Sequence, residues 1–80
     1  MRRIVFTAAA ARQWIRLAAP VRSRIDDKLL RFARTGEGDV KRLKGRAGVR
    51  LRVGDWRVVF FEQGDSIIVA AVGHRSDIYD

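Results

Sequence analysis

The first half of the chain contains one short strand pattern followed by two helical patterns. Residues 3–7 are rich in strand-forming types, and Thr7 is suited to cap an alanine-rich helix over residues 8–19. Pro20 ends that helix and favours the start of a second one, which Gly36 ends. The apolar positions of the second helix recur at helical spacing: Val21, Ile25, Leu29 and Phe32. The pattern therefore predicts a helical hairpin with one shared apolar face.

The second half changes to the two-residue period of strands. Apolar residues alternate with arginines over residues 49–53, which places Arg50 and Arg52 on one exposed face of a strand. After a two-residue turn, residues 56–61 return as a second strand, and Arg57 is expected on the same exposed face. One face of this strand pair is thus predicted to be core and the other basic.

The last strand pattern, residues 67–72, is apolar throughout, as expected of a strand in the middle of a sheet. The order of elements is then strand, helix, helix and three strands in a meander. This order predicts an α+β fold, in which the helical hairpin packs on one face of a mainly antiparallel, four-stranded sheet. The opposite face is left for the arginines.

Length and composition limit the classes of protein that the chain can be. Its 80 residues predict a single domain over residues 1–80, because so short a chain cannot divide its apolar residues between two cores. It contains no cysteine, which excludes disulfides and zinc–thiolate sites and favours a reducing cytoplasm. No apolar run approaches the roughly 20 residues of a membrane helix, and no signal-peptide core is present, so no membrane partner is expected.

Positive charge is concentrated in one part of the sequence. The net charge is +8, and residues 41–57 hold seven basic residues against one acid, Asp55. The basic residues of this stretch are Lys41, Arg42, Lys44, Arg46, Arg50, Arg52 and Arg57. A field of this sign attracts polyanions, so a nucleic acid or another acidic partner is expected.

Three segments carry a resemblance to a known family: VKRLKG at 40–45, VRLRVGDWRVVFFE at 49–62 and VGHRSDIY at 72–79. Their order and spacing resemble the RelE/ParE superfamily of toxins from bacterial type II toxin–antitoxin systems, and the RelE branch in particular. The resemblance implies a RelE-like domain that acts in the cytoplasm, enters the ribosomal A site and cuts mRNA there without a metal or other cofactor. It also implies silencing by a cognate antitoxin, with operator DNA bound only through that complex.

The resemblance assigns roles to the residues that match the family's motifs. Arg57, in GDWR, matches the arginine that supports the scissile phosphate, and Arg50 matches a basic residue on the preceding strand. Tyr79 resembles the C-terminal tyrosine credited with proton transfer, and His74 or Arg75 resembles the basic residue shortly before it. Two features depart from the family: a second strand lysine is missing, and no C-terminal helix is expected.

Metal-free RNA cleavage defines the chemistry that these residues must perform. The RNA's own 2′-hydroxyl attacks, so the protein must accept its proton, stabilise charge on the phosphate and protonate the departing 5′-oxygen. Arginine stays charged and grips phosphate oxygens with paired N–H donors, which suits Arg50, Arg57 and Arg75 to charge stabilisation. The proton transfers then fall to His74 or Tyr79, and the sequence does not assign acid and base between them.

The remaining basic residues are expected to bind RNA backbone phosphates: Lys41, Arg42, Lys44, Arg46 and Arg52.

Each assignment has a plainer alternative. A basic strand face is often only solvated surface, a lone histidine after a strand is often structural, and the Tyr79 ring is able to close the edge of the core. At the level of function, the rival is a ParE-like protein that inhibits DNA gyrase by binding and needs no ribonuclease residues. A third alternative is an inactive member of the family that is kept for autoregulation.

Overall fold

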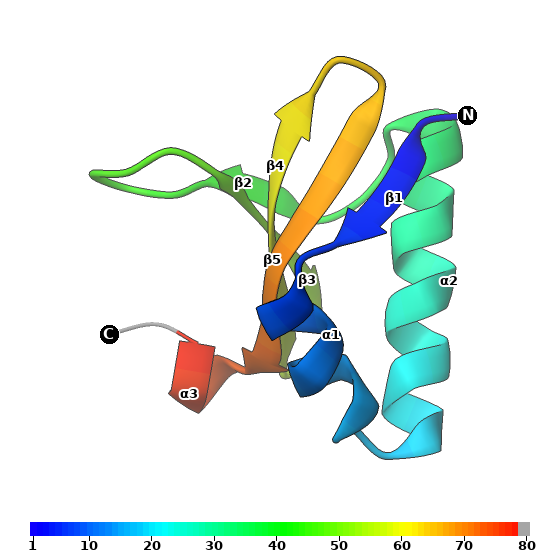
Figure 1. The fold of residues 1–80 in the computed structure, drawn as a ribbon, viewed down its shortest axis with the longest axis vertical. Coiled ribbons are helices and arrows are strands. Elements are labelled where there is room, and N and C mark those ends of the chain that lie inside the picture. Colours follow the sequence, from blue (N-terminus) through cyan, green and yellow to red (C-terminus); the bar gives the residue numbers. More distant parts are fainter. Residues whose placement is uncertain (79–80) are drawn as a thin grey trace.

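The computed structural model describes residues 1–78 of the chain. In this part a strand is followed by two helices, four further strands and a final helical turn (Figure 1). The elements are β1 (Arg3–Phe6), α1 (Ala8–Ile15), α2 (Ala19–Thr35), β2 (Val40–Arg42), β3 (Val49–Val53), β4 (Trp56–Gln63), β5 (Ser66–His74) and α3 (Arg75–Ile78).

Within residues 1–78 the sheet has five strands in the order β1-β5-β4-β3-β2. β1 is parallel to β5, and the other neighbouring strands are antiparallel. The α+β class and the mainly antiparallel sheet are therefore confirmed, but the expected count of four strands is wrong. The additional strand is β2, an edge strand of three exposed residues. A strand without buried positions produces no alternation of apolar and polar residues by which the sequence would reveal it.

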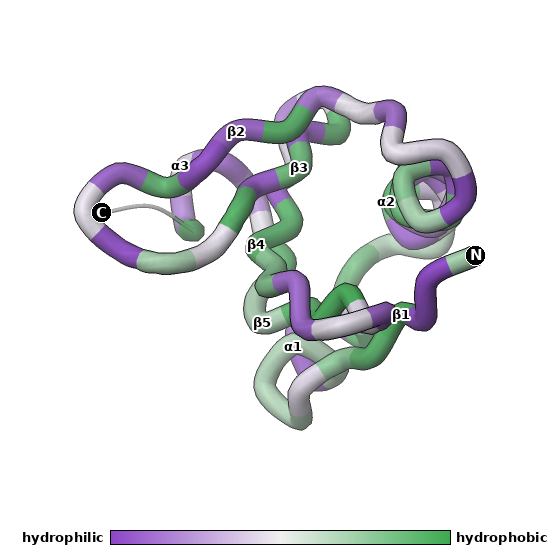
Figure 2. The backbone as a smooth tube through the Cα atoms, turned by 90° about the horizontal axis from the view of Figure 1, so that it is seen from above, coloured by the Kyte–Doolittle hydropathy of each residue, from purple (hydrophilic) through white to green (hydrophobic). Residues whose placement is uncertain are grey.

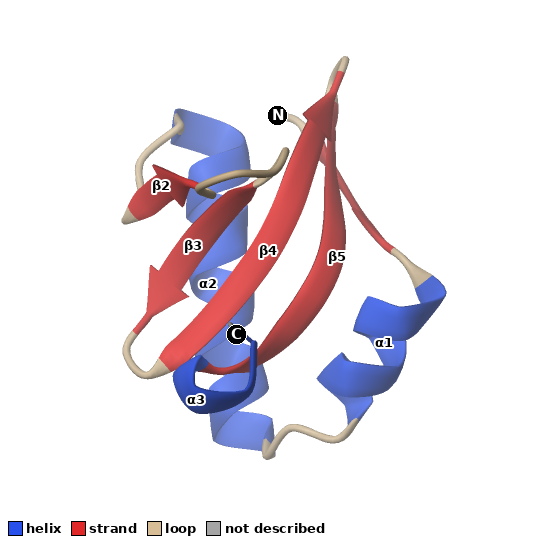
Figure 3. Ribbon diagram, turned by 90° about the vertical axis from the view of Figure 1, so that its left-hand side faces the viewer, coloured by secondary structure: helices blue, strands red, loops and turns tan. Residues whose placement is uncertain are grey.

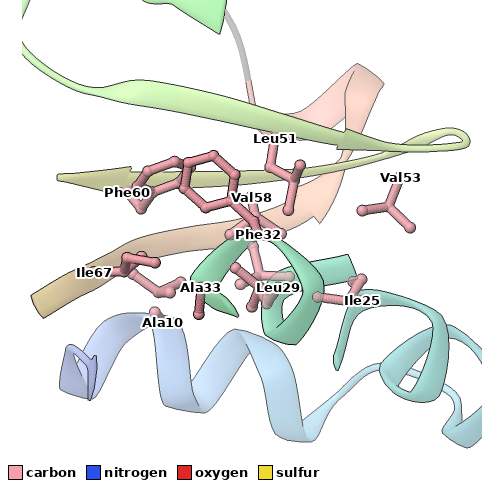
Figure 4. Close-up of a cluster of buried hydrophobic side chains, with 12 residues drawn as sticks. Ala10, Ile25, Leu29, Phe32, Ala33, Leu51, Val53, Val58, Phe60 and Ile67 are labelled. Atoms are coloured by element: carbon pink, nitrogen blue, oxygen red, sulfur yellow. The ribbon is translucent and has the colours of Figure 1, made fainter. Parts of the chain in front are cut away.

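The helices bury their apolar residues against the sheet. α2 covers one face of the sheet, and α1 lies alongside β5 (Figure 3). Side chains from both helices and from β3, β4 and β5 meet in one core (Figure 4). The largest fully buried side chains are Phe60, Ile25, Leu29, Leu51, Ile67, Val58 and Val69. The inward positions predicted for the second helix therefore include true core residues.

Local sequence explains where the two helices begin and end. The hydroxyl of Thr7 accepts the N–H of Ala10 at 3.1 Å, as expected of an N-cap. α1 ends at Ile15, earlier than residue 19, because Ala18 adopts an extended conformation as the N-cap of α2, with Pro20 in the first turn. Gly36 ends α2 in the left-handed region, with a φ of 78°.

Candidate functional site

Three arginines lie on the sheet face that is turned away from α2, which we call the outer face. Leu51, between Arg50 and Arg52, is fully buried against the helices, so strand alternation turns both arginines to the outer face. Arg57 lies directly opposite Arg52 in the register of β3 and β4, and Lys41 of β2 lies opposite Arg50. The strand register therefore brings the three arginines and one lysine onto one surface.

Arg57 is buried, although the sequence placed it on an exposed face. Only 8% of its surface is exposed, because its side chain folds back onto the turn between β3 and β4. Nη1 donates to the carbonyl oxygens of Gly54 at 2.8 Å and Trp56 at 3.0 Å. Nε is also buried, and it has no hydrogen-bond partner among residues 1–78. Such a donor costs about 1–3 kcal/mol.

Positive charge gathers around this turn from both sides. Arg52 places its Nε 3.5 Å from the carbonyl oxygen of Gly54 and its Nη1 3.9 Å from Oδ2 of Asp39. From α2, the Arg24 guanidinium approaches so closely that a Cβ on Gly54 would lie 2.6 Å from its Nη2. Gly54 also has a φ of 61°, in the region that favours glycine. The positive φ of the turn therefore favours glycine at this position, and any side chain there would displace the end of Arg24.

The basic residues on the helix side of the turn were missed by the sequence analysis. A cavity of about 280 Å³ between α2 and the turn is lined by Arg24, Asp27, Lys28, Arg31, Val53 and Gly54. Its three basic residues are spaced four and three apart along α2, so they share one helix face. That spacing was readable from the sequence. What it did not reveal is that this face of α2 meets the β3–β4 turn.

The acidic pair of α2 lies close to these basic residues. Burial raises the pKa of Asp26, the charge of Asp27 raises it further, and Arg22 opposes the rise. Asp26 is on α2, whereas Arg50, Arg52 and Arg57 point to the outer face of the sheet. The raised pKa therefore bears on the stability of α2 and not on chemistry at the outer face.

Arg75 is attached to the same turn. Its backbone N–H donates to the carbonyl oxygen of Asp55 at 2.8 Å, and its Nε lies 3.9 Å from Oδ1 of that residue. The side chain itself is mostly exposed. Arg75 also begins α3, a single helical turn, so the expectation of no C-terminal helix is wrong for residues 75–78. The attachment of α3 to Asp55 places Arg75 beside the start of β4 (Figure 3).

His74 faces away from the arginines. It lies opposite Trp56 in the sheet register, and the two rings meet edge to face with their centroids 5.3 Å apart. Trp56 packs against the core, so alternation places His74 on the face opposite to that of Arg57. The strand predicted over residues 67–72 stops short of His74, whereas β5 continues through His74 and its alternation continues with it. Nδ1 of His74 accepts the N–H of Ser76 at 3.2 Å, which holds the first turn of α3.

The residues expected to bind RNA backbone are all exposed, but they occupy different surfaces. They are Lys41 and Arg42 in β2, Lys44 and Arg46 in the loop after it, and Arg52 in β3. Arg42 lies opposite Val49, which packs against the core, so Arg42 points to the helix side while Lys41 points to the outer face. The loop between β2 and β3 projects from the sheet, and its hydrophilic positions alternate with apolar and glycine residues (Figure 2). Tyr79 lies outside the described residues, so its assignment remains a prediction.

Residues 1–78 contain neither a membrane-spanning helix nor a cluster of metal ligands. No helix in this part is long and apolar enough to cross a membrane. Nor do three or more histidine, aspartate or glutamate side chains of this part gather in a group that could hold a metal ion.

Residues 4–79 match the family described as ParE toxin of the type II toxin–antitoxin system, parDE. The chain belongs to this family. No curated protein sequence matches the toxin. Among solved structures it is similar to a chain of the RelB–RelE antitoxin–toxin complex from Methanococcus jannaschii, with 27% identity, a TM-score of 0.78 and 95% of each chain covered. The resemblance to RelE/ParE-superfamily toxins is thereby confirmed.

Two more distant structures share the fold. A copper-bound mutant toxin from Helicobacter pylori has 16% identity and a TM-score of 0.83, with 99% of this chain and 100% of that chain covered. A chain of the intact Escherichia coli RelBE toxin–antitoxin complex has 21% identity and a TM-score of 0.73, with 92% and 96% covered. The fold of the chain is therefore shared with these toxins over nearly its whole length.

Proposed function

We propose that this toxin is an endoribonuclease that cleaves mRNA in the ribosomal A site without a metal, and so inhibits translation. The observation that best supports the proposal is the Arg57 guanidinium. Two carbonyl oxygens hold it in place, its Nε is buried without a partner among residues 1–78, and it lies on the same face as Arg50 and Arg52. A cation fixed before the reaction stabilises a developing phosphorane-like charge without reorganising at that moment.

In this mechanism the arginines supply charge and no protons. The 2′-hydroxyl of the RNA attacks the adjacent phosphorus, and the bond to the 5′-oxygen of the next nucleotide breaks. Arg57 and Arg50 bind the phosphate oxygens, because guanidinium groups present paired donors and remain charged. Arg52 and Lys41 bind neighbouring phosphates from the same outer face.

The proton transfers belong to the C-terminal segment. We assign them to Tyr79, which follows α3 directly in the sequence. His74 is then a positioning residue, because its ring packs on Trp56 and its Nδ1 accepts the N–H of Ser76 at the start of α3. Arg75, attached to Asp55 at the turn, adds charge from the same segment.

A cognate antitoxin is part of the proposal. The net charge of +8 favours an acidic protein partner, whose disordered tail would fold on binding. Relatives of the same fold were solved in antitoxin complexes, RelB–RelE from M. jannaschii and YoeB–YefM from Staphylococcus aureus. We propose that the toxin acts in the cytoplasm and meets operator DNA only through this antitoxin complex.

The second candidate is inhibition of DNA gyrase, and the family match favours it, because that family is described by the ParE toxin. A gyrase inhibitor acts by binding and has no need of an arginine whose guanidinium is held in place for a phosphate. The two candidates therefore differ in whether substitution of Arg57 lowers the rate of mRNA cleavage on ribosomes.

Primer extension on an mRNA in a reaction with translating ribosomes separates the candidates. Wild-type toxin is expected to produce cuts in the A-site codon, and Arg57→Ala is expected to lower the cleavage rate by about 10²- to 10³-fold. Arg12→Ala is the matched control, because it removes the same charge from an exposed position on α1. Circular dichroism checks that both variants are folded. Absence of cuts, together with inhibition of DNA supercoiling by gyrase, would establish the ParE-like function instead.

A further inference from the structure

The outer face carries an exposed aromatic ring beyond its arginines. Phe61 is 39% exposed, whereas Phe60 beside it is fully buried in the core. Strand alternation therefore directs Phe61 to the outer face, the same face as Arg57. Phe61 is four residues from Arg57 along β4, so the two positions are separated by about 14 Å.

The residue beside the Phe61 ring on the neighbouring strand side is a glycine, Gly48. Gly48 lies beside the ring, and a Cβ at Gly48 would stand 3.2 Å from the ring and 3.2 Å from Cδ1 of Leu43. Gly48 also has a φ of 118°, which side chains rarely adopt. Glycine at this position keeps the space next to the ring free of a side chain. On the other flank Phe61 lies opposite Ile68 of β5.

The charges around Phe61 favour a polyanion. Arg50 and Lys41 occupy the row of the sheet between Phe61 and Arg57. By the strand register, no acidic residue of β3 or β4 points to the outer face, since Glu62 lies opposite the buried Ile67. An aromatic ring at the end of a basic track is the arrangement by which proteins bind single-stranded nucleic acid, with bases stacked on rings and phosphates held by cations.

We propose that Phe61 is the stacking platform for one nucleobase of the bound RNA. The strand lies along β4, with phosphates at Arg57 and Arg50 and a base on the Phe61 ring. This inference rests on the proposed function, because it takes the RNA of that reaction as the occupant of the outer face. It assigns Phe61 to substrate binding and base preference, and not to the chemistry of cleavage.

The test compares two RNAs of equal charge. Full-length toxin is titrated with a fluorescein-labelled adenylate hexamer and with an abasic ribose–phosphate hexamer, and binding is followed by fluorescence anisotropy. Phe61→Leu is expected to weaken binding of the adenylate hexamer by about tenfold and to leave the abasic hexamer unchanged, because only the stacked base is lost. Phe61→Trp, which keeps a stacking ring, is expected to bind the adenylate hexamer at least as tightly as wild type.

Val5→Ala is the matched control, because Val5 is an apolar residue with 43% exposure on the same face, opposite Ile68. It is expected to bind both RNAs as wild type does. The proposal is overturned if wild type binds the two hexamers equally, or if Phe61→Leu weakens both alike. It is also overturned if Phe61→Leu and Val5→Ala leave RNA binding intact but weaken capture of an acidic antitoxin. The apolar surface formed by Phe61, Ile68 and Val5 would then be a protein-binding surface.

Ribosome cleavage measured on the same preparations separates this inference from the proposed function. If wild-type toxin cleaves mRNA but Phe61→Leu does not change hexamer binding, the stacking role is refuted and the proposed nuclease activity is retained. If hexamer binding depends on the bases through Phe61 but no mRNA is cleaved on ribosomes, the stacking role is retained and the proposed nuclease activity is refuted.

Discussion

Arg57 and His74 lie near the same end of two neighbouring strands, yet the structure uses them differently. Arg57 is opposite Gly73, and His74, one residue further along β5, is opposite Trp56. That single step reverses the face of the sheet. Arg57 donates to the turn carbonyls of Gly54 and Trp56 from the outer face, whereas His74 packs on Trp56 and holds α3. Two residues that are close in sequence or in space therefore need not share a function when their side chains point to opposite faces of the sheet.

The largest expected effect tests whether the geometry of Arg57 matters beyond its charge. Arg57→Lys keeps one positive charge but loses the planar fork that reaches the carbonyl oxygens of Gly54 and Trp56. We expect the rate of mRNA cleavage on ribosomes to fall by about 100-fold.

Arg52→Lys is the matched control, because Arg52 lies directly across the sheet and is exposed. Its cleavage rate should fall by less than about threefold, as for a contact that positions the backbone. Equal losses in the two variants would show that the outer face acts only through its net charge.

The next effect concerns the turn that holds Arg57. Gly54→Ala and Gly64→Ala both place a side chain at positive φ, at 61° and 57°, so each should lose about 1–2 kcal/mol of unfolding free energy in urea titrations. Of these two glycines, Gly54 lies beside Arg24 and its carbonyl accepts from Arg57, whereas the space around Gly64 is open. We expect cleavage to fall about tenfold in Gly54→Ala and to be unchanged in Gly64→Ala when both are assayed well below their melting temperatures. Normal cleavage by Gly54→Ala would mean that the glycine geometry of this turn is not needed to hold Arg57.

A smaller effect is expected at His74, and it separates positioning from proton transfer. His74→Ala removes the acceptor for the Ser76 N–H, and we expect about a fivefold lower cleavage rate, since a lost helix cap costs about 1 kcal/mol. His74→Asn, which retains a capping acceptor, should recover most of the rate with a pH–rate profile of unchanged shape. If His74 exchanged protons in the reaction, both variants would lose about 10²- to 10⁴-fold.

The same distinction explains what the sequence was able to predict. Alternation over residues 49–53 and 56–61 correctly placed Arg50, Arg52 and Arg57 on one face, because a local period determines the facing of a strand. The burial of Arg57 was not predictable in this way, since it depends on a turn carbonyl that accepts the side chain. The facing of His74 was not predicted, because the predicted strand stopped at residue 72, two residues before His74. The contact of Arg24 with the turn requires the tertiary packing of α2.

The smallest effect applies the same comparison to β2. Lys41 and Arg42 are adjacent and exposed, but Lys41 lies opposite Arg50 on the outer face, and Arg42 lies opposite the core residue Val49. If RNA lies on the outer face, Lys41→Gln should weaken binding of the abasic hexamer by about two- to threefold at 150 mM salt and reduce the slope of log affinity against log salt by about 1. Arg42→Gln, with the same loss of one charge, should leave that slope nearly unchanged. Equal slopes for the two variants would mean that RNA follows the edge of the sheet instead of its outer face, because only at the edge do both side chains approach the same phosphates.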